Sequence, residues 1–273
     1  MNRFGIHGGV FGADVPFVER IRRAAAAGFS SVEIVVGVEG LLRFESPIQE
    51  YEELGRAARD SGGEVSALSS AAFFSAHFAS QAAEARQAAR DRTLRMLDAA
   101  AACGAGAIVI IPAVVGRAGD ARPQCSYADA LHLAAAALTE LRGDAEARAV
   151  TIAIENVWNR FLLSPVEMAD FIDTVNSPNV GVCFDTGNVM ATGYPEDWIR
   201  TLGGRIARVH IKDYDVSRPG REGFCALGAG SVDWPAVGSA LREAAYAGPL
   251  TYEGGGEPAE IRAALERVLG PHV

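Results

Sequence analysis

The sequence predicts a single (β/α)8 barrel that spans residues 1–273. Three observations lead to this prediction: strand-like and helix-like segments alternate eight times, the length suits a barrel of this class, and no linker interrupts the pattern. A doubly wound sheet of eight strands is the competing architecture. The alanine-rich stretches fit helices that pack closely on the outside of a barrel, so we expect one domain.

Eight hydrophobic segments, most of them rich in valine and isoleucine, predict the strands. Their nearly continuous apolar character is typical of strands covered on both faces, as parallel strands are. We expect strands at residues 3–8, 30–36, 64–70, 106–112, 150–156, 180–185, 206–212 and 249–253.

Helical segments separate these strands. Several begin with a capping residue next to or near proline, as in Ser46-Pro47, Ser164-Pro165 and Asp233-Trp234-Pro235, and glycine closes many of them. We expect helices at residues 15–27, 47–61, 80–103, 126–142, 164–174, 195–203, 233–246 and 257–269.

The chain is acidic, with 25 basic and 34 acidic residues and a formal net charge of −9. It has no Lys/Arg cluster, which binding to nucleic acid or to an anionic membrane requires, so we expect neither partner. No run of about 18 apolar residues predicts a membrane span, and the amino terminus has no apolar signal core. The four cysteines are scattered without CxxC spacing. We therefore expect a soluble, cytoplasmic protein.

Four predicted strands in the second half of the chain end at a residue of metal-binding type. In a barrel, the carboxyl ends of the strands face one mouth, where these side chains would converge. Three carboxylates alone would repel one another, and a divalent cation resolves that repulsion. Three oxygen donors and one nitrogen donor suit Mn²⁺, Mg²⁺ or Co²⁺ better than a zinc site of the thiolate type, and ligand type does not choose among them. We expect Mn²⁺, with Mg²⁺, Co²⁺ and Zn²⁺ left open. The expected metal ligands are Glu155, Asp185, His210 and Glu253.

The stretches ENVWNRFLLSP, GVCFDTGNVMATGYPEDWI, VHIKDYD and LGAGSVDW resemble the sugar phosphate isomerase/epimerase family, the xylose isomerase-like TIM barrels. That group includes ketose 3-epimerases, pentulose- and hexulose-phosphate epimerases, inosose isomerases and dehydratases, and endonuclease IV. The resemblance implies that Glu155, Asp185, His210 and Glu253 match the family's four metal ligands. It also implies that Glu155 and Glu253 act as the acid/base pair.

The resemblance and the ligand set together predict a metal-dependent isomerase or epimerase acting on a sugar or sugar phosphate. A divalent ion bound to a ketose carbonyl and the adjacent hydroxyl oxygen stabilises the enediolate that forms when the neighbouring C–H proton leaves. Carboxylates on opposite faces of the substrate, here Glu155 and Glu253, then remove and return the proton. The main alternative is a lyase, dehydratase or isomerase acting on a keto-inositol or a related cyclic polyol or acid, because the same enediolate can expel a β-hydroxyl.

Further residues near the expected mouth are candidates for contacting the substrate. Lys212 lies two residues beyond His210 and so points to the same side, where it could bind a substrate oxygen or phosphate. Trp158 could stack on a sugar face. Each candidate also has a structural interpretation as a strand end, a turn or a packing residue. The expected substrate contacts are Lys212, Asn188, Asn156, His7, Glu33, His77, Trp158 and Arg221, with His7 and Glu33 ending the first two strands.

Three positions depart from the free-ketose 3-epimerases of this family. Asn188 stands where those enzymes usually have a histidine, and Leu162 stands where they have a glutamate. Their arginine after the seventh strand has no match in register, although Arg218 and Arg221 lie nearby. These departures disfavour a free hexulose and leave a sugar phosphate, a keto-inositol or a modified sugar acid as substrate.

An endonuclease IV-like DNA repair enzyme is the remote alternative. Its three-zinc cluster draws on several additional histidines, and this chain has five in all. A non-enzymatic sugar-binding barrel is a third class, and the intact acid/base pair argues against it. Homodimers and homotetramers are common in the family, and the sequence adds no interface signal of its own.

Overall fold

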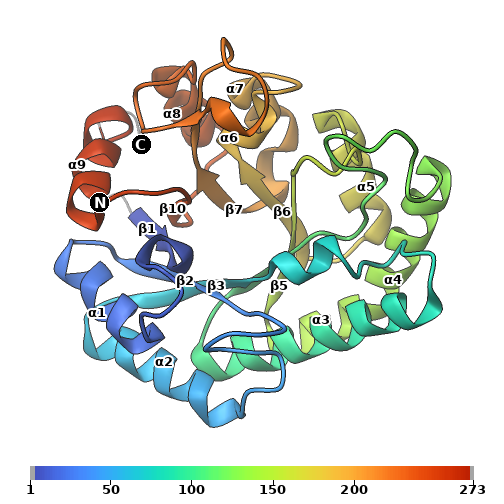
Figure 1. The fold of residues 1–273 in the computed structure, drawn as a ribbon, viewed down its shortest axis with the longest axis horizontal. Coiled ribbons are helices and arrows are strands. Elements are labelled where there is room, and N and C mark those ends of the chain that lie inside the picture. The colour runs from blue at the N-terminus through green and yellow to red at the C-terminus, as the bar shows by residue number, and fades with distance from the viewer. Residues whose placement is uncertain (1–3, 271–273) are drawn as a thin grey trace.

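Eight parallel strands close into a barrel in the computed structural model, which describes residues 4–270 (Figure 1). The barrel strands are β1 (Phe4–His7), β2 (Ser31–Val35), β3 (Glu64–Ser69), β4 (Ala107–Ile110), β5 (Thr151–Glu155), β6 (Val180–Asp185), β7 (Ile206–Ile211) and β10 (Leu250–Tyr252). Their order around the ring is β1-β10-β7-β6-β5-β4-β3-β2, and every neighbouring pair is parallel. The closed ring confirms the predicted barrel and excludes the doubly wound sheet.

Helices follow the strands and form an outer ring around the barrel (Figure 1). As predicted, Ser164 begins a helix, and its side chain accepts a hydrogen bond from the Glu167 N–H at 3.2 Å. The expected cap at Ser46 is wrong, because Ser46 accepts from the N–H of Arg43 instead. Within residues 4–270, no helix combines the length and apolar character that a membrane crossing needs. The long helices are α1 (Phe17–Ala26), α2 (Ile48–Asp60), α3 (Ala83–Cys103), α4 (Tyr127–Arg148), α5 (Pro165–Val175), α7 (Pro195–Leu202), α8 (Trp234–Glu243) and α9 (Pro258–Val268).

Several short elements that the sequence did not predict follow the carboxyl ends of the strands. The helix α6 (Thr186–Val189) follows β6 directly, and a small antiparallel hairpin follows β7. That hairpin consists of β8 (Asp213–Tyr214) and β9 (Phe224–Cys225). The remaining short elements are the 3-10 turns η1 (Gly8–Phe11), η2 (Ala71–Phe74), η3 (Gly203–Arg205) and η4 (Gly220–Gly223). Except for η3, these pieces shape the mouth of the barrel.

Small apolar side chains fill the inside of the barrel. Successive residues of a strand face opposite sides, so Ala153 and Glu155 share the inner face of β5 while Ile152 and Ile154 pack in the outer core with the helices. The inner cluster comprises Ala67, Ala107, Val109, Ala153 and Cys183. Glu155 and Asp185 lie two residues beyond members of this cluster, so they occupy the next layer toward the mouth.

Candidate metal centre

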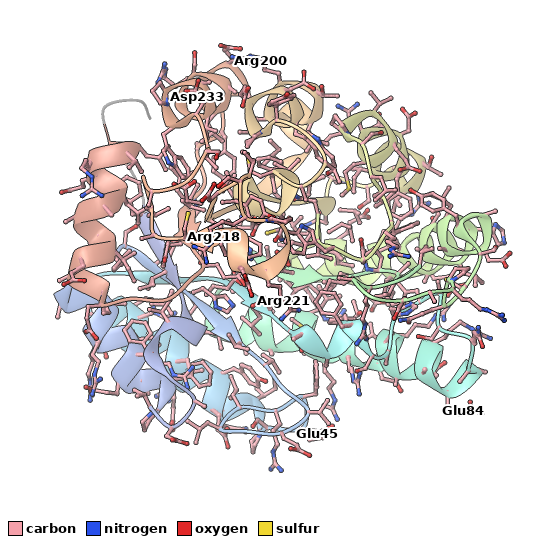
Figure 2. All side chains as sticks on the ribbon, turned by 45° about the horizontal axis from the view of Figure 1, so that its top comes forward. Glu45, Glu84, Arg200, Arg218, Arg221 and Asp233 are labelled. Atoms are coloured by element: carbon pink, nitrogen blue, oxygen red, sulfur yellow. The ribbon has the colours of Figure 1, made fainter. Side chains whose placement is uncertain are left out.

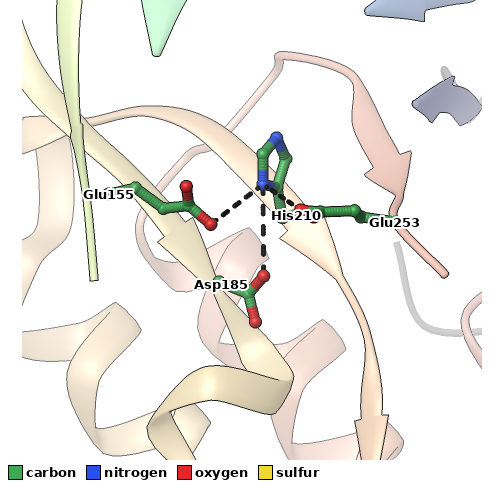
Figure 3. Close-up of side chains that lie close together, drawn as sticks. All are labelled: Glu155, Asp185, His210 and Glu253. Atoms are coloured by element: carbon green, nitrogen blue, oxygen red, sulfur yellow. Dashed lines mark hydrogen bonds and ion pairs between the residues drawn. The ribbon is translucent and has the colours of Figure 1, made fainter. Parts of the chain in front are cut away.

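The four predicted metal ligands converge at the mouth of the barrel (Figure 3). Glu155 and Asp185 are the last residues of β5 and β6, His210 is the penultimate residue of β7, and Glu253 follows β10 directly. Each residue offers one ligand atom, and these four atoms all lie within 4.8 Å of one another. Parallel pairing produces this convergence, because Asp185 stands beside His210 in the register of β6 with β7.

The imidazole of His210 lies between the two glutamates. Its Nδ1 is 3.4 Å from Glu155 Oε1 and 3.0 Å from Glu253 Oε2, and Figure 3 shows these carboxylates approaching it from opposite sides. Asp185 Oδ2 is farther away, at 4.0 Å. The side chains of Asp185 and His210 are 0% and 2% exposed, whereas that of Glu253 is 29% exposed. The two glutamates are therefore the cluster members nearest the open mouth.

The donor set fits a divalent cation. Asp185 Oδ2 is buried and accepts no hydrogen bond from the described residues, although the Lys212 ammonium lies 2.9 Å from it. The Lys212 ammonium offsets one of the three negative charges of the carboxylates, and a divalent cation would offset the other two. Oxygen atoms from three carboxylates with one imidazole nitrogen suit hard or borderline divalent ions. Glu155, Asp185, His210 and Glu253 could hold such an ion.

The environments of the two glutamates displace their pKa values in opposite directions. Burial raises the pKa of Glu155 above its ordinary value. Burial acts on Glu253 in the same sense, but the Lys212 ammonium and the His210 ring outweigh it and hold the pKa of Glu253 well below its usual range.

Glu33 supports the imidazole from the side opposite the cluster. Its Oε2 lies 2.8 Å from His210 Nε2, and its side chain is 1% exposed. Glu33 lies in the middle of β2, not at its end as the sequence analysis expected. His7 Nε2 is 3.6 Å from the other oxygen of Glu33 and 3.2 Å from Ser69 Oγ. The arrangement fits a carboxylate that holds the Nε2–H tautomer of His210, so that Nδ1 is directed at the ligand cluster.

We expect the Glu33→Gln substitution to weaken binding of Mn²⁺ by about 10- to 100-fold, as loss of a carboxylate behind a metal-binding histidine typically does. The amide keeps the size of the side chain but removes the charge that orients the imidazole. Isothermal titration calorimetry with Mn²⁺ would measure the change, and circular dichroism would check that the fold persists. Unchanged affinity would show that His210 keeps its orientation without this carboxylate.

Two residues expected to contact the substrate, Asn156 and Asn188, orient the cluster and its neighbours, and their contact with a substrate stays a prediction. The Asn156 side chain accepts from the Asp185 N–H at 2.7 Å and donates to the Asp185 carbonyl at 3.0 Å, which fixes the end of β6. The Asn188 amide donates to the Asn156 carbonyl at 3.0 Å and approaches Glu155 Oε1 at 3.5 Å. Trp158 Nε1 donates to the Asn188 carbonyl at 2.9 Å. The side-chain amide of Asn188 therefore lies next to an oxygen of Glu155, one of the four candidate metal ligands.

A cavity of about 290 Å³ adjoins these residues, and Asn156, Trp158, Arg160, Leu162 and Asn188 are part of its lining. It extends between the segment after β5 and the helix α6. A larger cavity, of about 560 Å³, lies at the amino-terminal end of β6 and β7, where Gly181 and Arg205 line it. The smaller cavity lies at the carboxyl ends of the strands, where active sites of barrels lie, and beside the four ligand candidates, none of which lines it.

Lys212 points to the same side as His210 and pairs with two members of the cluster, which the sequence did not reveal, while its contact with a substrate stays a prediction. Its Nζ lies 2.9 Å from Asp185 Oδ2 and 3.0 Å from Glu253 Oε2. Burial alone would lower the pKa of this ammonium, but the Asp185 and Glu253 carboxylates outweigh burial and hold the pKa above its ordinary value. The side chain is therefore a fixed positive charge beside the ligands.

Phe224 and Tyr214, which were not predicted from the sequence, form a wall beside Lys212 together with Trp158. Trp158 stacks on Phe224 with ring centroids 5.2 Å apart, and Tyr214 meets both rings edge-on. Asp213, 1% exposed, anchors the following loop by accepting from the N–H groups of Gly228 and Gly230 at 2.7 and 3.2 Å. The pattern IKDYD followed by LGAGSVDW is the signal for this anchor, since a buried aspartate needs several donors.

Neither His77 nor Arg221 touches the four ligands in the contacts that the structure shows for residues 4–270. His77 is 4% exposed, and burial lowers its pKa to about 4, so the ring is neutral at pH 7. Arg221 is exposed on η4 and lies near the middle of the view in Figure 2, whereas Glu84 lies at its outer edge. Their predicted substrate contacts stay predictions.

The fold and this cluster together define a parallel barrel with a candidate divalent-metal centre at its mouth. A family model described as xylose isomerase-like TIM barrel matches residues 21–269, and the chain belongs to this family. Solved structures share the fold across almost the whole chain. A D-psicose 3-epimerase with D-fructose covers 98% of this chain and 99% of its own at 19% identity and a TM-score of 0.79. A 3-keto-D-glucoside 4-epimerase from E. coli covers the same shares at 17% identity and a TM-score of 0.80.

Curated relatives match shorter parts of the chain. A 3-oxo-isoapionate decarboxylase of Pectobacterium atrosepticum is 38% identical over 77 residues, which are 26% of this chain and 28% of that protein. A D-psicose 3-epimerase of Enterocloster bolteae is 31% identical over 135 residues, which are 46% of this chain and 42% of that protein. The matched segments thus span less than half of these relatives.

Proposed function

We propose that this protein is a divalent-metal-dependent isomerase or epimerase of a sugar or sugar phosphate, with Glu155 and Glu253 as its acid/base pair. The observation that carries the proposal is the placement of these two carboxylates on opposite sides of His210, within one set of four metal-ligand atoms. A substrate held above the set would present one face to each glutamate. Relatives named as D-psicose and L-ribulose 3-epimerases support this class of reaction.

A bound divalent ion would supply Lewis-acid polarisation of the substrate carbonyl. The residues of the chain supply the proton transfers. One glutamate takes the proton from the carbon next to the carbonyl, the electron pair of the broken C–H bond forms a carbon–carbon double bond, and the carbonyl π pair moves onto oxygen. The other glutamate then returns a proton to the opposite face, which inverts the centre, or a proton returns to the neighbouring carbon, which yields an aldose.

The proposal also includes the metal ion and the cellular compartment. Three carboxylates and one imidazole suit Mn²⁺, Mg²⁺, Co²⁺ and Zn²⁺, and of these we propose Mn²⁺. Cys103, Cys125, Cys183 and Cys225 are all free thiols, which suits a reducing compartment, so we infer a cytoplasmic enzyme with a small carbohydrate as its partner.

Decarboxylation of a 3-oxo sugar acid is a second candidate. The relative named 3-oxo-isoapionate decarboxylase favours it. So does the Lys212 ammonium, which offers a carboxylate a partner beside the candidate metal site. In this reaction the C–C bond to the carboxylate breaks and CO₂ leaves, the electron pair of that bond forms a carbon–carbon double bond, and the carbonyl π pair moves onto oxygen. A proton then adds to the carbon that lost CO₂. In both candidate reactions a negative charge develops on the carbonyl oxygen. They differ in the group that leaves carbon, which is a proton in isomerisation and CO₂ in decarboxylation.

Nuclear magnetic resonance in deuterium oxide distinguishes these reactions. The protein loaded with Mg²⁺, which is diamagnetic, would be incubated with ketoses, ketose phosphates, inososes and 3-oxo sugar acids. Deuterium beside the carbonyl in an isomeric product supports the isomerase, loss of CO₂ supports the decarboxylase, and loss of water indicates a dehydratase. If Mn²⁺-loaded protein, assayed by chromatography, also changes none of these compounds, the proposed function is wrong.

A further inference from the structure

Lys212 is the only lysine of the chain, because arginine accounts for all the other basic residues among the 25. Among residues 4–270, arginine forms the exposed ion pairs on the outside of the barrel, such as Arg200 with Glu243 and Arg205 with Asp173. Lysine and arginine are not interchangeable where a compact point charge with freely rotating donors is needed. Lys212, the one lysine, lies at the mouth of the barrel beside Asp185 and Glu253, two of the candidate metal ligands.

Residues after β6 hold the backbone of Lys212 in place. The Thr186 hydroxyl donates to the Lys212 carbonyl at 2.8 Å and accepts from the Lys212 N–H at 3.0 Å. A Cβ on Gly187 would lie 2.6 Å from Lys212 Cβ and 3.2 Å from the Phe224 ring, so only glycine leaves room there. The segment Thr186-Gly187 thus fixes where the side chain of Lys212 begins.

The Lys212 ammonium has one N–H group that its two ion pairs with carboxylates do not use. Two of its three N–H groups can serve Asp185 Oδ2 and Glu253 Oε2, at 2.9 and 3.0 Å. The Phe224 ring centroid is 5.7 Å from Nζ and offers a cation–π contact on one side. The side chain is 15% exposed, so the third N–H can reach a substrate oxygen placed above the cluster.

Charge balance indicates what this donor does. The three ligand carboxylates together carry one more negative charge than a divalent cation neutralises. Transfer of a proton from the substrate to one of the glutamates leaves this total unchanged, but it moves one negative charge from that carboxylate onto the substrate oxygen. A fixed ammonium at about 3 Å from two ligand oxygens offsets that charge in a poorly solvated site, where electrostatic stabilisation is strongest.

We propose that Lys212 is a third catalytic residue, whose ammonium donates a hydrogen bond to the substrate oxygen that becomes negative when the proton leaves carbon. The inference rests on the proposed function. In the step, the C–H proton goes to a glutamate, the C–H electron pair forms the new double bond, and the carbonyl π pair moves to the oxygen facing Lys212. The ammonium keeps all its protons and is not consumed.

The first test separates catalysis from positioning. Lys212→Met keeps the length of the side chain, and we expect it to lower kcat for deuterium exchange by about 10²- to 10³-fold, with KM changed less than about fivefold. Lys212→Arg should recover only part of the rate, because Gly187 and Phe224 confine the larger group. Arg200→Met, which removes an exposed charge from α7, is the matched control and should leave kcat unchanged.

The affinity for Mn²⁺, measured by calorimetry, completes this test. Lys212→Met should bind Mn²⁺ at least as tightly as the wild type, since a competing positive charge is gone. A loss confined to KM, an unchanged kcat, or affinity for Mn²⁺ weakened more than about tenfold would each overturn the catalytic role. Wild-type protein without any exchange activity would contradict the proposed function instead, which keeps the two failures distinguishable.

The second test uses the single lysine directly. Protein labelled with ¹⁵Nζ-lysine should give one side-chain ammonium resonance, absent from Lys212→Arg, so no assignment is needed. Glycolohydroxamate, a planar mimic of an enediolate, would be titrated into protein loaded with diamagnetic Mg²⁺. We expect the resonance to shift with the hydroxamate and to saturate with its binding curve. A resonance that stays unchanged while calorimetry shows the hydroxamate bound, or a hydroxamate that does not bind, would overturn the contact.

Discussion

Replacing either Glu155 or Glu253 with glutamine is expected to lower the net conversion of substrate by about 10²- to 10⁴-fold, the range of one lost general acid or base. The amide retains an oxygen that can contact a cation, but it cannot take or return a proton. The assay is product formation under saturating substrate and Mn²⁺, followed by nuclear magnetic resonance or chromatography.

The two variants should differ in a way that a metal-binding defect alone would not produce. Each keeps one functional carboxylate on one side of His210. In an epimerase, each variant should therefore still exchange deuterium into the one epimer whose proton faces the intact glutamate. Equal loss of exchange from both epimers in both variants would contradict the two-sided acid/base pair.

An exposed glutamate, Glu84, provides the matched control for these two substitutions. Glu84 lies in the first turn of α3, at the periphery of the molecule in Figure 2. Glu84→Gln makes the same atomic change far from the barrel mouth and should retain full activity. Metal content, measured by mass spectrometry of the purified variants, identifies any loss of activity that comes from loss of metal.

The sequence predicted the convergence of the ligands because the relevant information is local. A buried parallel strand reads as a continuous apolar run, and the first charged residue at its carboxyl end lies at the mouth of any barrel. Asp185 and His210 could be placed in this way without knowing the register between β6 and β7. The same reasoning placed Glu155 and Glu253.

Interactions that depend on register between strands could not be predicted from the sequence. Glu33 was expected at the end of the second strand, yet it lies in the middle of β2, where His7 is its neighbour on β1. Its contact with His210 joins residues 177 positions apart in the chain. Such a contact follows from barrel closure, which no local pattern encodes.

The contacts made by the loops at the mouth are a second feature that could not be predicted from the sequence. Lys212 was expected to face the substrate from its spacing alone, but its ion pairs with Asp185 and Glu253 depend on side-chain length and on the room left at Gly187. The short helix α6 and the β8–β9 hairpin are too brief for periodicity to reveal. They nevertheless set the positions of Asn188 and Phe224 around the cluster.

Removal of metal by a chelator such as EDTA is expected to abolish turnover while leaving the barrel folded, and Mn²⁺ should restore activity. The fold should persist because the inner apolar cluster and the outer core do not include the four ligands. Thermal unfolding followed by circular dichroism should show a lower midpoint for the chelated protein. Mn²⁺ at about 100 times its dissociation constant stabilises a folded protein by about 2.7 kcal/mol when only the folded state binds.

The variant Asp185→Asn tests whether the stabilisation by Mn²⁺ comes from binding at these four residues. Asp185 is fully buried, and its carboxylate is the ligand candidate least open to solvent, so its neutralisation should remove most of the affinity for Mn²⁺. The Mn²⁺-dependent rise of the unfolding midpoint should therefore disappear in this variant, while Glu84→Gln retains it. A midpoint that rises equally in Asp185→Asn and wild type would mean that Mn²⁺ binds elsewhere. Full turnover by protein shown to be free of metal would contradict the metal-dependent reaction itself.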